Sequence, residues 1–162
     1  MNEDGAIMSE QTTIENVIKA AIAGEEDAYA LYTNAAKTVQ SAMARAMLQD
    51  LAKEEAGHKA KLQGLLRQGV SGSFTAGAFK RVADLKVGDH LTAKPLGEKA
   101  DLQDVLIVAI QREKESHELY ATMAGVACDT VVHNMLQFLA NEELEHKRKL
   151  ESLYEEVIYQ HF

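Results

Sequence analysis

The sequence predicts an all-α protein, a four-helix bundle made of two repeated helical hairpins that are joined by a long crossover. Strong helix formers such as Ala, Leu, Glu, Lys and Gln dominate the 162 residues, and proline occurs once. The chain repeats itself after 88 residues, and glycine is concentrated between the two copies. A chain of this length is most simply one domain, here residues 1–162, with repeat halves of about 12–68 and 100–159.

The repeat is clearest around two histidines, His58 and His146. A shift of 88 residues places "MLQDLAKEEAGHKAKL" (47–62) on "MLQFLANEELEHKRKL" (135–150), with 11 of 16 positions identical. Upstream, "AIAGEEDAYALYTNAA" (21–36) falls on "AIQREKESHELYATMA" (109–124), with 6 of 16 identical. No gap is needed between the two windows, so we interpret the halves as a duplication related by a pseudo-twofold axis.

Each copy is predicted to form two helices. In the first helix, apolar residues from Ile14 to Ala35 follow the i, i+3, i+4 spacing, and "TTIE" at 12–15 resembles a capping box at its start. The second helix is expected over about 41–68. The third is expected to begin near 101, and the fourth to cover about 129–159. Ser41 and Asp129 are repeat equivalents, and both are good N-cap residues.

The crossover is expected over about 69–100. It contains six of the eleven Gly and Pro residues of the chain, which are typical of loops. A short helix is expected inside it near 75–84.

Bulk properties exclude several function classes. The net charge of −8 argues against non-specific binding to nucleic acid, and no run approaches the 18 apolar residues of a membrane span. Cys128 is the single cysteine, which excludes an intrachain disulfide and any four-cysteine metal site. The polar, acidic N-terminus "MNEDGAIMSEQ" lacks the features of a secretory signal. We therefore expect a cytoplasmic protein.

The two Glu-x-x-His motifs are predicted to meet in one site. Each histidine follows a glutamate by three residues, which places both side chains on one helix face. The repeat supplies a further glutamate pair, Glu25 and Glu113. In antiparallel hairpins that turn near residues 40 and 128, these glutamates lie level with the two motifs. Six groups then converge at mid-bundle: Glu25, Glu55, His58, Glu113, Glu143 and His146.

One Glu-x-x-His alone is usually solvated helix surface, but the paired set has a chemical consequence. Four carboxylates inside a bundle repel one another and are costly to desolvate, and divalent cations relieve both problems. Four carboxylates and two imidazoles neutralise two divalent ions and leave positions open for a substrate. Such ligands suit iron or manganese better than structural zinc. The other four histidines are expected in surface or satisfied polar roles.

These residues resemble the rubrerythrin family of the ferritin-like di-iron carboxylate superfamily. The resemblance rests on "AIAGEEDAYALY" and "EEAGHK" in the first half and on "AIQREKESHELY" and "EELEHK" in the second. It implies two iron ions, with manganese or zinc as alternative loaded metals. It also implies that the six groups are the metal ligands and carry the catalysis, with Glu55 and Glu143 bridging. Tyr32 and Tyr120 share the faces of Glu25 and Glu113 and are candidate hydrogen-bond donors to ligand carboxylates.

The chain departs from that family in two respects. Rubrerythrins usually carry a rubredoxin domain with a four-cysteine iron site, whereas Cys128 stands alone here, so an external electron-donor protein is expected. Rubrerythrins also tend to have another glutamate three residues after the third-helix ligand, where this chain has Ser116.

The leading hypothesis is a non-haem di-iron oxidoreductase that reacts with hydrogen peroxide or dioxygen. The alternatives are an iron-oxidising and iron-storage protein of ferritin type, and a bundle with a vestigial site. A homodimer is expected, with exchange of a hairpin across the crossover as one variant.

Overall fold

The computed structural model describes residues 3–83, 96 and 100–159, and within them the chain folds into helices that confirm the all-α prediction. The helices are α1 (Glu3–Thr38), α2 (Ala42–Gln68), α3 (Ala78–Ala83), α5 (Leu102–Val126) and α6 (Thr130–Tyr159). None of the described helices is long and apolar enough to cross a membrane.

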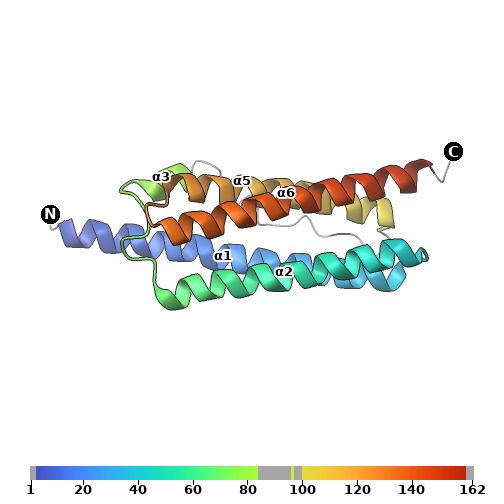
Figure 1. Ribbon diagram of the computed structural model, residues 1–162, viewed down its shortest axis with the longest axis horizontal. Helices are drawn as coiled ribbons and strands as arrows, with labels where there is room; N and C mark the ends of the chain where they lie inside the picture. Colours follow the sequence, from blue (N-terminus) through green and yellow to red (C-terminus); the bar gives the residue numbers. More distant parts are fainter. Residues whose placement is uncertain (1–2, 84–95, 97–99, 160–162) are drawn as a thin grey trace.

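Two long hairpins lie side by side along the long axis of the molecule (Figure 1). Helix α1 packs mainly against α2, and α5 packs mainly against α6, while contacts of α1 with α5 and of α2 with α6 join the two hairpins. Residues 39–41 and 127–129 make the two short connections. The chain therefore forms the predicted bundle, in which each repeat half supplies one hairpin.

Two of the three expected helix caps are present, and α5 has a further cap at Asp101. Ser41 Oγ accepts a hydrogen bond from the Ala44 N–H at 3.2 Å, and Asp129 Oδ1 accepts one from the Val132 N–H at 3.0 Å. Asp101 and Asp104 form a reciprocal capping box at the start of α5. These side chains satisfy backbone donors that a helix start leaves unpaired.

The predicted capping box at "TTIE" is wrong, because α1 begins at Glu3 and runs through residues 12–15 without a break. Nine residues ahead of Thr12 therefore belong to the helix. The spacing of Thr and Glu that suits a cap also suits a helix interior, so the motif did not fix the boundary.

The start of the crossover is attached to the turn of the second hairpin. The Thr75 N–H donates to the Val126 carbonyl at 2.8 Å, and the Cys128 N–H donates to the Ser73 carbonyl at 2.9 Å. Gly72 and Gly77 have φ values of 73° and 76°, a region that favours glycine. Helix α3 lies within the range predicted for a short helix, and residues 84–95 and 97–99 of the crossover lie outside the described residues.

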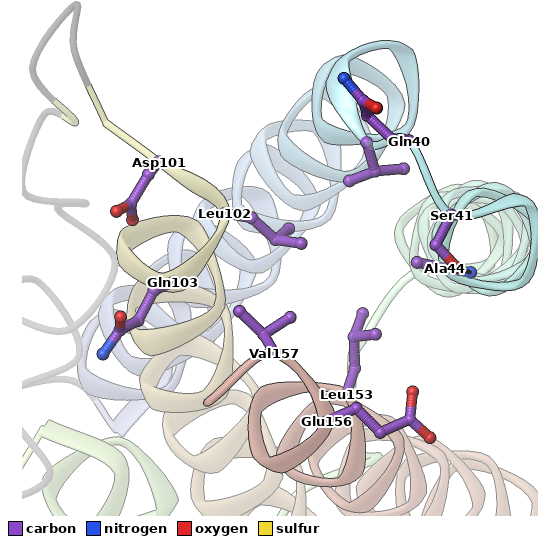
Figure 2. Close-up of a pocket in the computed structure, with 10 residues that line it drawn as sticks. Gln40, Ser41, Ala44, Asp101, Leu102, Gln103, Leu153, Glu156 and Val157 are labelled. Atoms are coloured by element: carbon purple, nitrogen blue, oxygen red, sulfur yellow. Dashed lines mark hydrogen bonds between the residues drawn. The ribbon is translucent and has the colours of Figure 1, made fainter. Parts of the chain in front are cut away.

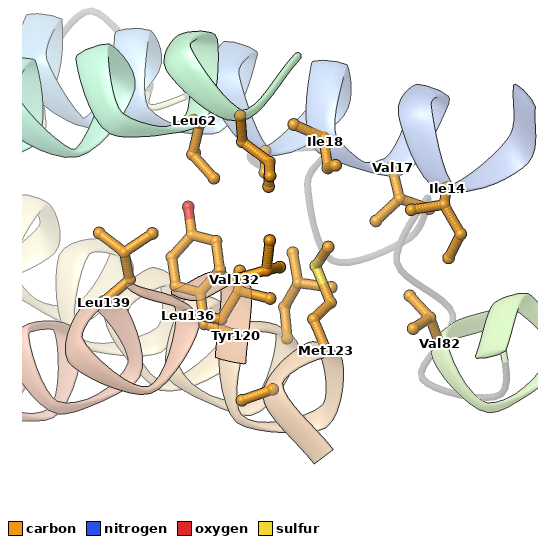
Figure 3. Packing of buried hydrophobic residues seen from close by; sticks show 14 of the residues in the cluster. Ile14, Val17, Ile18, Leu62, Val82, Tyr120, Met123, Val132, Leu136 and Leu139 are labelled. Carbon is orange, nitrogen blue, oxygen red and sulfur yellow. The ribbon is translucent and has the colours of Figure 1, made fainter. Parts of the chain in front are cut away.

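Buried apolar residues form two cores that lie on either side of a polar layer. One core joins the first half of α1 and the end of α2 to α3, the end of α5 and the start of α6, and it includes Ile18, Leu62 and Leu136 (Figure 3). The other joins the α1–α2 turn to the start of α5 and the end of α6, and it includes Leu48 and Leu106. Such cores hold the bundle together independently of the residues between them.

A cavity of about 280 Å³ lies at the end of the bundle that holds the α1–α2 turn (Figure 2). The cap residues Ser41 and Asp101 line it together with Leu102, Leu153 and Val157. None of the six predicted ligands borders it, so this cavity belongs to the bundle end and not to the polar layer.

Candidate metal centre

The polar layer consists of the six groups that the sequence predicts to converge. They are between 0% and 4% exposed although all are polar: Glu25, Glu55, His58, Glu113, Glu143 and His146. Helices α1 and α5 each supply one glutamate, and α2 and α6 each supply a glutamate and a histidine. Burial of this many ionisable groups is costly unless they bind one another or a cation.

His58 contacts three of the carboxylates through a single ring nitrogen. Its Nδ1 lies 2.7 Å from Glu143 Oε1, 3.2 Å from Glu55 Oε2 and 3.7 Å from Glu25 Oε2. The contact with Glu55 follows from the i, i+3 spacing on α2, whereas the contact with Glu143 crosses to α6.

His146 repeats this pattern from the other hairpin. Its Nδ1 lies 3.1 Å from Glu55 Oε1, 3.6 Å from Glu113 Oε2 and 4.0 Å from Glu143 Oε2. The two imidazole rings are stacked, with centroids 5.3 Å apart and planes at 12°. Both histidines thus reach both Glu55 and Glu143, while each reaches only the α1 or α5 glutamate of its own repeat half.

Hydrogen bonds divide the four carboxyl groups into two kinds. Burial, together with the charges of neighbouring carboxylates, holds the pKa of Glu55 and of Glu143 well above the usual range. Burial also acts on Glu25, but hydrogen bonds with Glu55 and His58 outweigh it and lower the pKa. At Glu113 burial is outweighed by hydrogen bonds with Glu143 and His146, which lower the pKa to about 2. Glu55 and Glu143 are therefore the carboxyl groups of the layer that hold a proton most readily.

Several polar atoms in the layer lie within 4 Å of another polar atom but make no hydrogen bond among the described residues. They are Glu55 Oε2, His58 Nδ1, Glu113 Oε2 and Glu143 Oε1. One ligand atom each of Glu55, His58, Glu143 and His146 lies within 4.8 Å of the others, which is close enough to share a metal ion. Oxygen and imidazole donors in this ratio fit iron. The buried cluster therefore fits a di-iron site.

The two tyrosines hydrogen-bond across the repeat. Tyr32 on α1 donates to Glu113 on α5, and Tyr120 on α5 donates to Glu25 on α1. Figure 3 shows the Tyr120 hydroxyl pointing toward the α1–α2 hairpin. Burial, followed by the charge of the bonded glutamate, raises the pKa of both phenols, so they remain donors. The sequence predicted these donors, but it placed each one only by the glutamate of its own helix.

Glu54 is a contact that the sequence analysis missed. Its Oε2 lies 2.6 Å from Nε2 of His146, on the side of the ring away from the layer. The available signal was the doubled glutamate ahead of each histidine, "EEAGH" and "EELEH". His117 and His133 have the satisfied polar roles that were expected, because their Nδ1 atoms bond to the carbonyls of Ala140 and Ala124. His90 and His161 lie outside the described residues.

A small cavity reaches the layer between α1 and α5. Its volume is about 20 Å³, which is enough for one water-sized molecule. Three carboxyl groups of the layer, those of Glu25, Glu113 and Glu143, line it from inside. Gly24, Ala28 and Ser116 also line it, together with the longer side chains of Arg112 and Glu115.

The comparisons with known proteins agree with this site. No curated protein and no solved structure gives a significant match to the chain. A family model described as Rubrerythrin matches residues 16–154, which include all six residues of the polar layer and both tyrosines. The chain belongs to the rubrerythrin family.

Proposed function

We propose that the protein is a non-haem di-iron oxidoreductase that reduces hydrogen peroxide or dioxygen. The observation that carries the proposal is the buried layer of four carboxyl groups and two imidazoles, with four polar atoms that make no hydrogen bond among the described residues. In the fold alone such a layer has an energetic cost, which metal ligation removes. Two bound iron ions supply two electrons between them as they pass from the ferrous to the ferric state.

The contacts support a specific division of ligands. Glu25 and His58 belong to one metal position, and Glu113 and His146 belong to the other, because each histidine reaches only that terminal glutamate. Glu55 and Glu143 contact both histidines, which suits them to bridge the two positions. Tyr32 and Tyr120 orient the terminal glutamates by donating hydrogen bonds to them.

The cavity between α1 and α5 supports a small oxidant as the substrate. About 20 Å³ beside Glu25, Glu113 and Glu143 suits a molecule of two to four atoms and is too small for an organic hydroperoxide. The Tyr32 and Tyr120 hydroxyls lie in the same layer. They are the nearest sources of the protons that reduction of an O–O bond consumes.

Electrons for repeated turnover come, in this proposal, from a separate donor protein, since one cysteine cannot build a four-thiolate iron site. We also propose a homodimer in the cytoplasm. The iron-storage alternative receives less support, because both repeat halves contribute equivalent ligands, including one histidine each, to a single symmetric site.

The decisive experiment is metal analysis of protein reconstituted anaerobically with ferrous iron, followed by oxidation with peroxide or with dioxygen. We expect about two iron ions per chain and stoichiometric oxidation by the physiological oxidant. The count per chain stays at two if partners exchange a hairpin. A metal content near zero would contradict the proposed function.

A further inference from the structure

The outer nitrogen of His146 is bound by a carboxylate from the opposite hairpin. The ring is nearly fully buried, and its Nδ1 faces the polar layer 3.1 Å from Glu55. Its Nε2 points the other way, 2.6 Å from Oε2 of Glu54 on α2. The imidazole of His146 is thus held between two carboxyl groups, one inside the layer and one at the protein surface.

The first repeat half does not reproduce this contact. Glu142 occupies the position equivalent to Glu54, yet all three ion pairs of His58 use Nδ1. Within the part of the chain that the structure describes, no carboxylate pairs with the outer nitrogen of His58. Glu142 instead lies near Glu54 and His146, with one ligand atom of each within 4.8 Å of the others.

The lysines near this contact also differ between the two repeat halves. Lys149 lies 3.7 Å from Glu54 Oε1, so it helps to keep this carboxylate at the α2–α6 seam. Its repeat equivalent, Lys61, lies over the ring of Phe138, 5.4 Å from the centroid. Position 138 corresponds to Asp50 in the first half, so the aromatic ring that Lys61 contacts has no equivalent beside Lys149.

We propose that Glu54 is a positioning residue that fixes His146 with its Nδ1 lone pair toward the metal layer and makes the two metal positions unequal. The inference rests on the proposed function of the layer as a two-metal site. It adds that the position of Glu113 and His146 binds a metal more tightly and has the lower ferric/ferrous potential.

The physical reason is the hydrogen bond on the far side of the ring. A carboxylate that accepts the Nε2 proton selects the tautomer in which Nδ1 carries the lone pair, and it holds the ring in one orientation. The negative charge of the acceptor also increases electron donation from Nδ1, which favours the more highly charged ferric ion. His58 has no such acceptor in the described structure, so its metal position lacks both effects.

The test compares Glu54→Gln with the matched variant Glu142→Gln, which changes the equivalent residue of the other copy. Stepwise Zn²⁺ binding to the metal-free full chain is followed by calorimetry, and circular dichroism checks that both variants are helical. We expect Glu54→Gln to weaken one of the two binding steps by about 10–100-fold and to leave the other unchanged. Glu142→Gln removes a charge near His146 but no bond to its ring, so it should change the two steps less than Glu54→Gln does.

Two further measurements report on positioning itself. In the Zn²⁺-loaded wild type, ¹⁵N spectra of the histidine rings should show the His146 proton on Nε2, with slow solvent exchange that Glu54→Gln accelerates. In the iron-loaded protein, Glu54→Gln should raise the lower of the two ferric/ferrous potentials.

Equal effects of the two glutamine variants, or a His146 ring protonated at Nδ1, would overturn the role of Glu54 while two metals still bind. A wild type without two binding steps would overturn the proposed function and this inference with it. The outcomes therefore distinguish the two failures, and the ¹⁵N measurement on the wild type decides even if a variant fails to fold.

Discussion

The two repeat halves agree at the metal layer and differ immediately around it. Each contributes two glutamates, one histidine and one tyrosine, and each tyrosine donates to a glutamate of the other half. Outside the layer, Gly24 corresponds to Arg112 and Ala28 to Ser116. Among the described residues, a carboxylate across the α2–α6 seam binds the outer nitrogen of a histidine in the second half and not in the first.

This difference indicates that the two halves can keep the same ligands while the residues around those ligands differ. Six ligands from two copies are enough to define a symmetric pair of metal positions. Their surroundings then distinguish the positions, through a glutamate on one histidine and through unequal side chains at the α1–α5 cavity. Five predictions test this comparison between the two halves.

The largest effect is expected when the histidines of both halves are removed together. His58→Ala with His146→Ala takes one nitrogen donor from each metal position, so oxidant-dependent turnover should be lost. The two apolar cores on either side of the layer should keep the helices, because neither core includes the histidines. Activity assays and circular dichroism check both statements. Strong loss of helicity would instead mean that the metals are structural.

Metal affinity should rise steeply with pH. Burial raises the pKa of Glu55 and Glu143, so the metal-free layer carries protons that binding must release. Release of up to two protons per chain gives up to roughly a 100-fold change in overall affinity per pH unit below those pKa values. Titration with Mn²⁺ in weakly buffered solution and a pH indicator measures the release. Binding without proton release would contradict the protonated state of this pair.

Without metal, the contribution of Glu55 and Glu143 to folding stability should fall as pH rises, which is opposite to the pH dependence of metal affinity. A carboxyl group whose pKa is raised on folding stabilises the protein below its ordinary pKa, and this contribution disappears as pH rises through the folded value. The lowered pKa values of Glu25 and Glu113 act oppositely, and the contribution of Glu113 disappears as pH falls toward about 2. Denaturant unfolding of metal-free protein as a function of pH should therefore show a maximum between these limits.

Removal of either tyrosine hydroxyl should have similar effects on the two halves. Tyr32→Phe and Tyr120→Phe each delete a buried hydrogen bond to a glutamate, which costs roughly 1.5–3 kcal/mol in unfolding free energy. Urea unfolding of the metal-free variants measures the loss. A clear difference between the two would show that the asymmetry extends into the layer itself.

The smallest effect is expected at the cavity between α1 and α5. Ser116→Leu adds volume to a space of about 20 Å³, whereas Ser116→Ala leaves the space open. The leucine variant should slow oxidation by peroxide roughly tenfold, about 1.4 kcal/mol of barrier. Stopped-flow oxidation of the ferrous protein checks the rates, with Zn²⁺ affinity as a control on ligand geometry. Equal rates in both variants would place the oxidant path elsewhere.

The bundle and the six converging groups could be predicted from the sequence alone. The features behind this prediction can be recognised without coordinates because they are properties of the sequence itself. They are the helix-forming composition, the repeat offset of 88 residues, and residues suited to helix starts at Ser41, Asp101 and Asp129. The i, i+3 spacing places a glutamate and a histidine on one helix face whatever the helix packs against. The start of α1 was misplaced because a Thr-x-x-Glu pattern is equally compatible with a helix interior.

Which atoms meet across the hairpins depends on the tertiary packing of the helices. Tyr32 bonds to Glu113 of the other half because of how α1 faces α5. Glu54 binds the outer nitrogen of His146, whereas Glu142 does not pair with the outer nitrogen of His58, and this difference depends on how α2 faces α6. Such contacts join residues 81 and 92 positions apart. Their geometry is set by the rotation and offset of packed helices, which identical sequence spacing in the two halves does not specify.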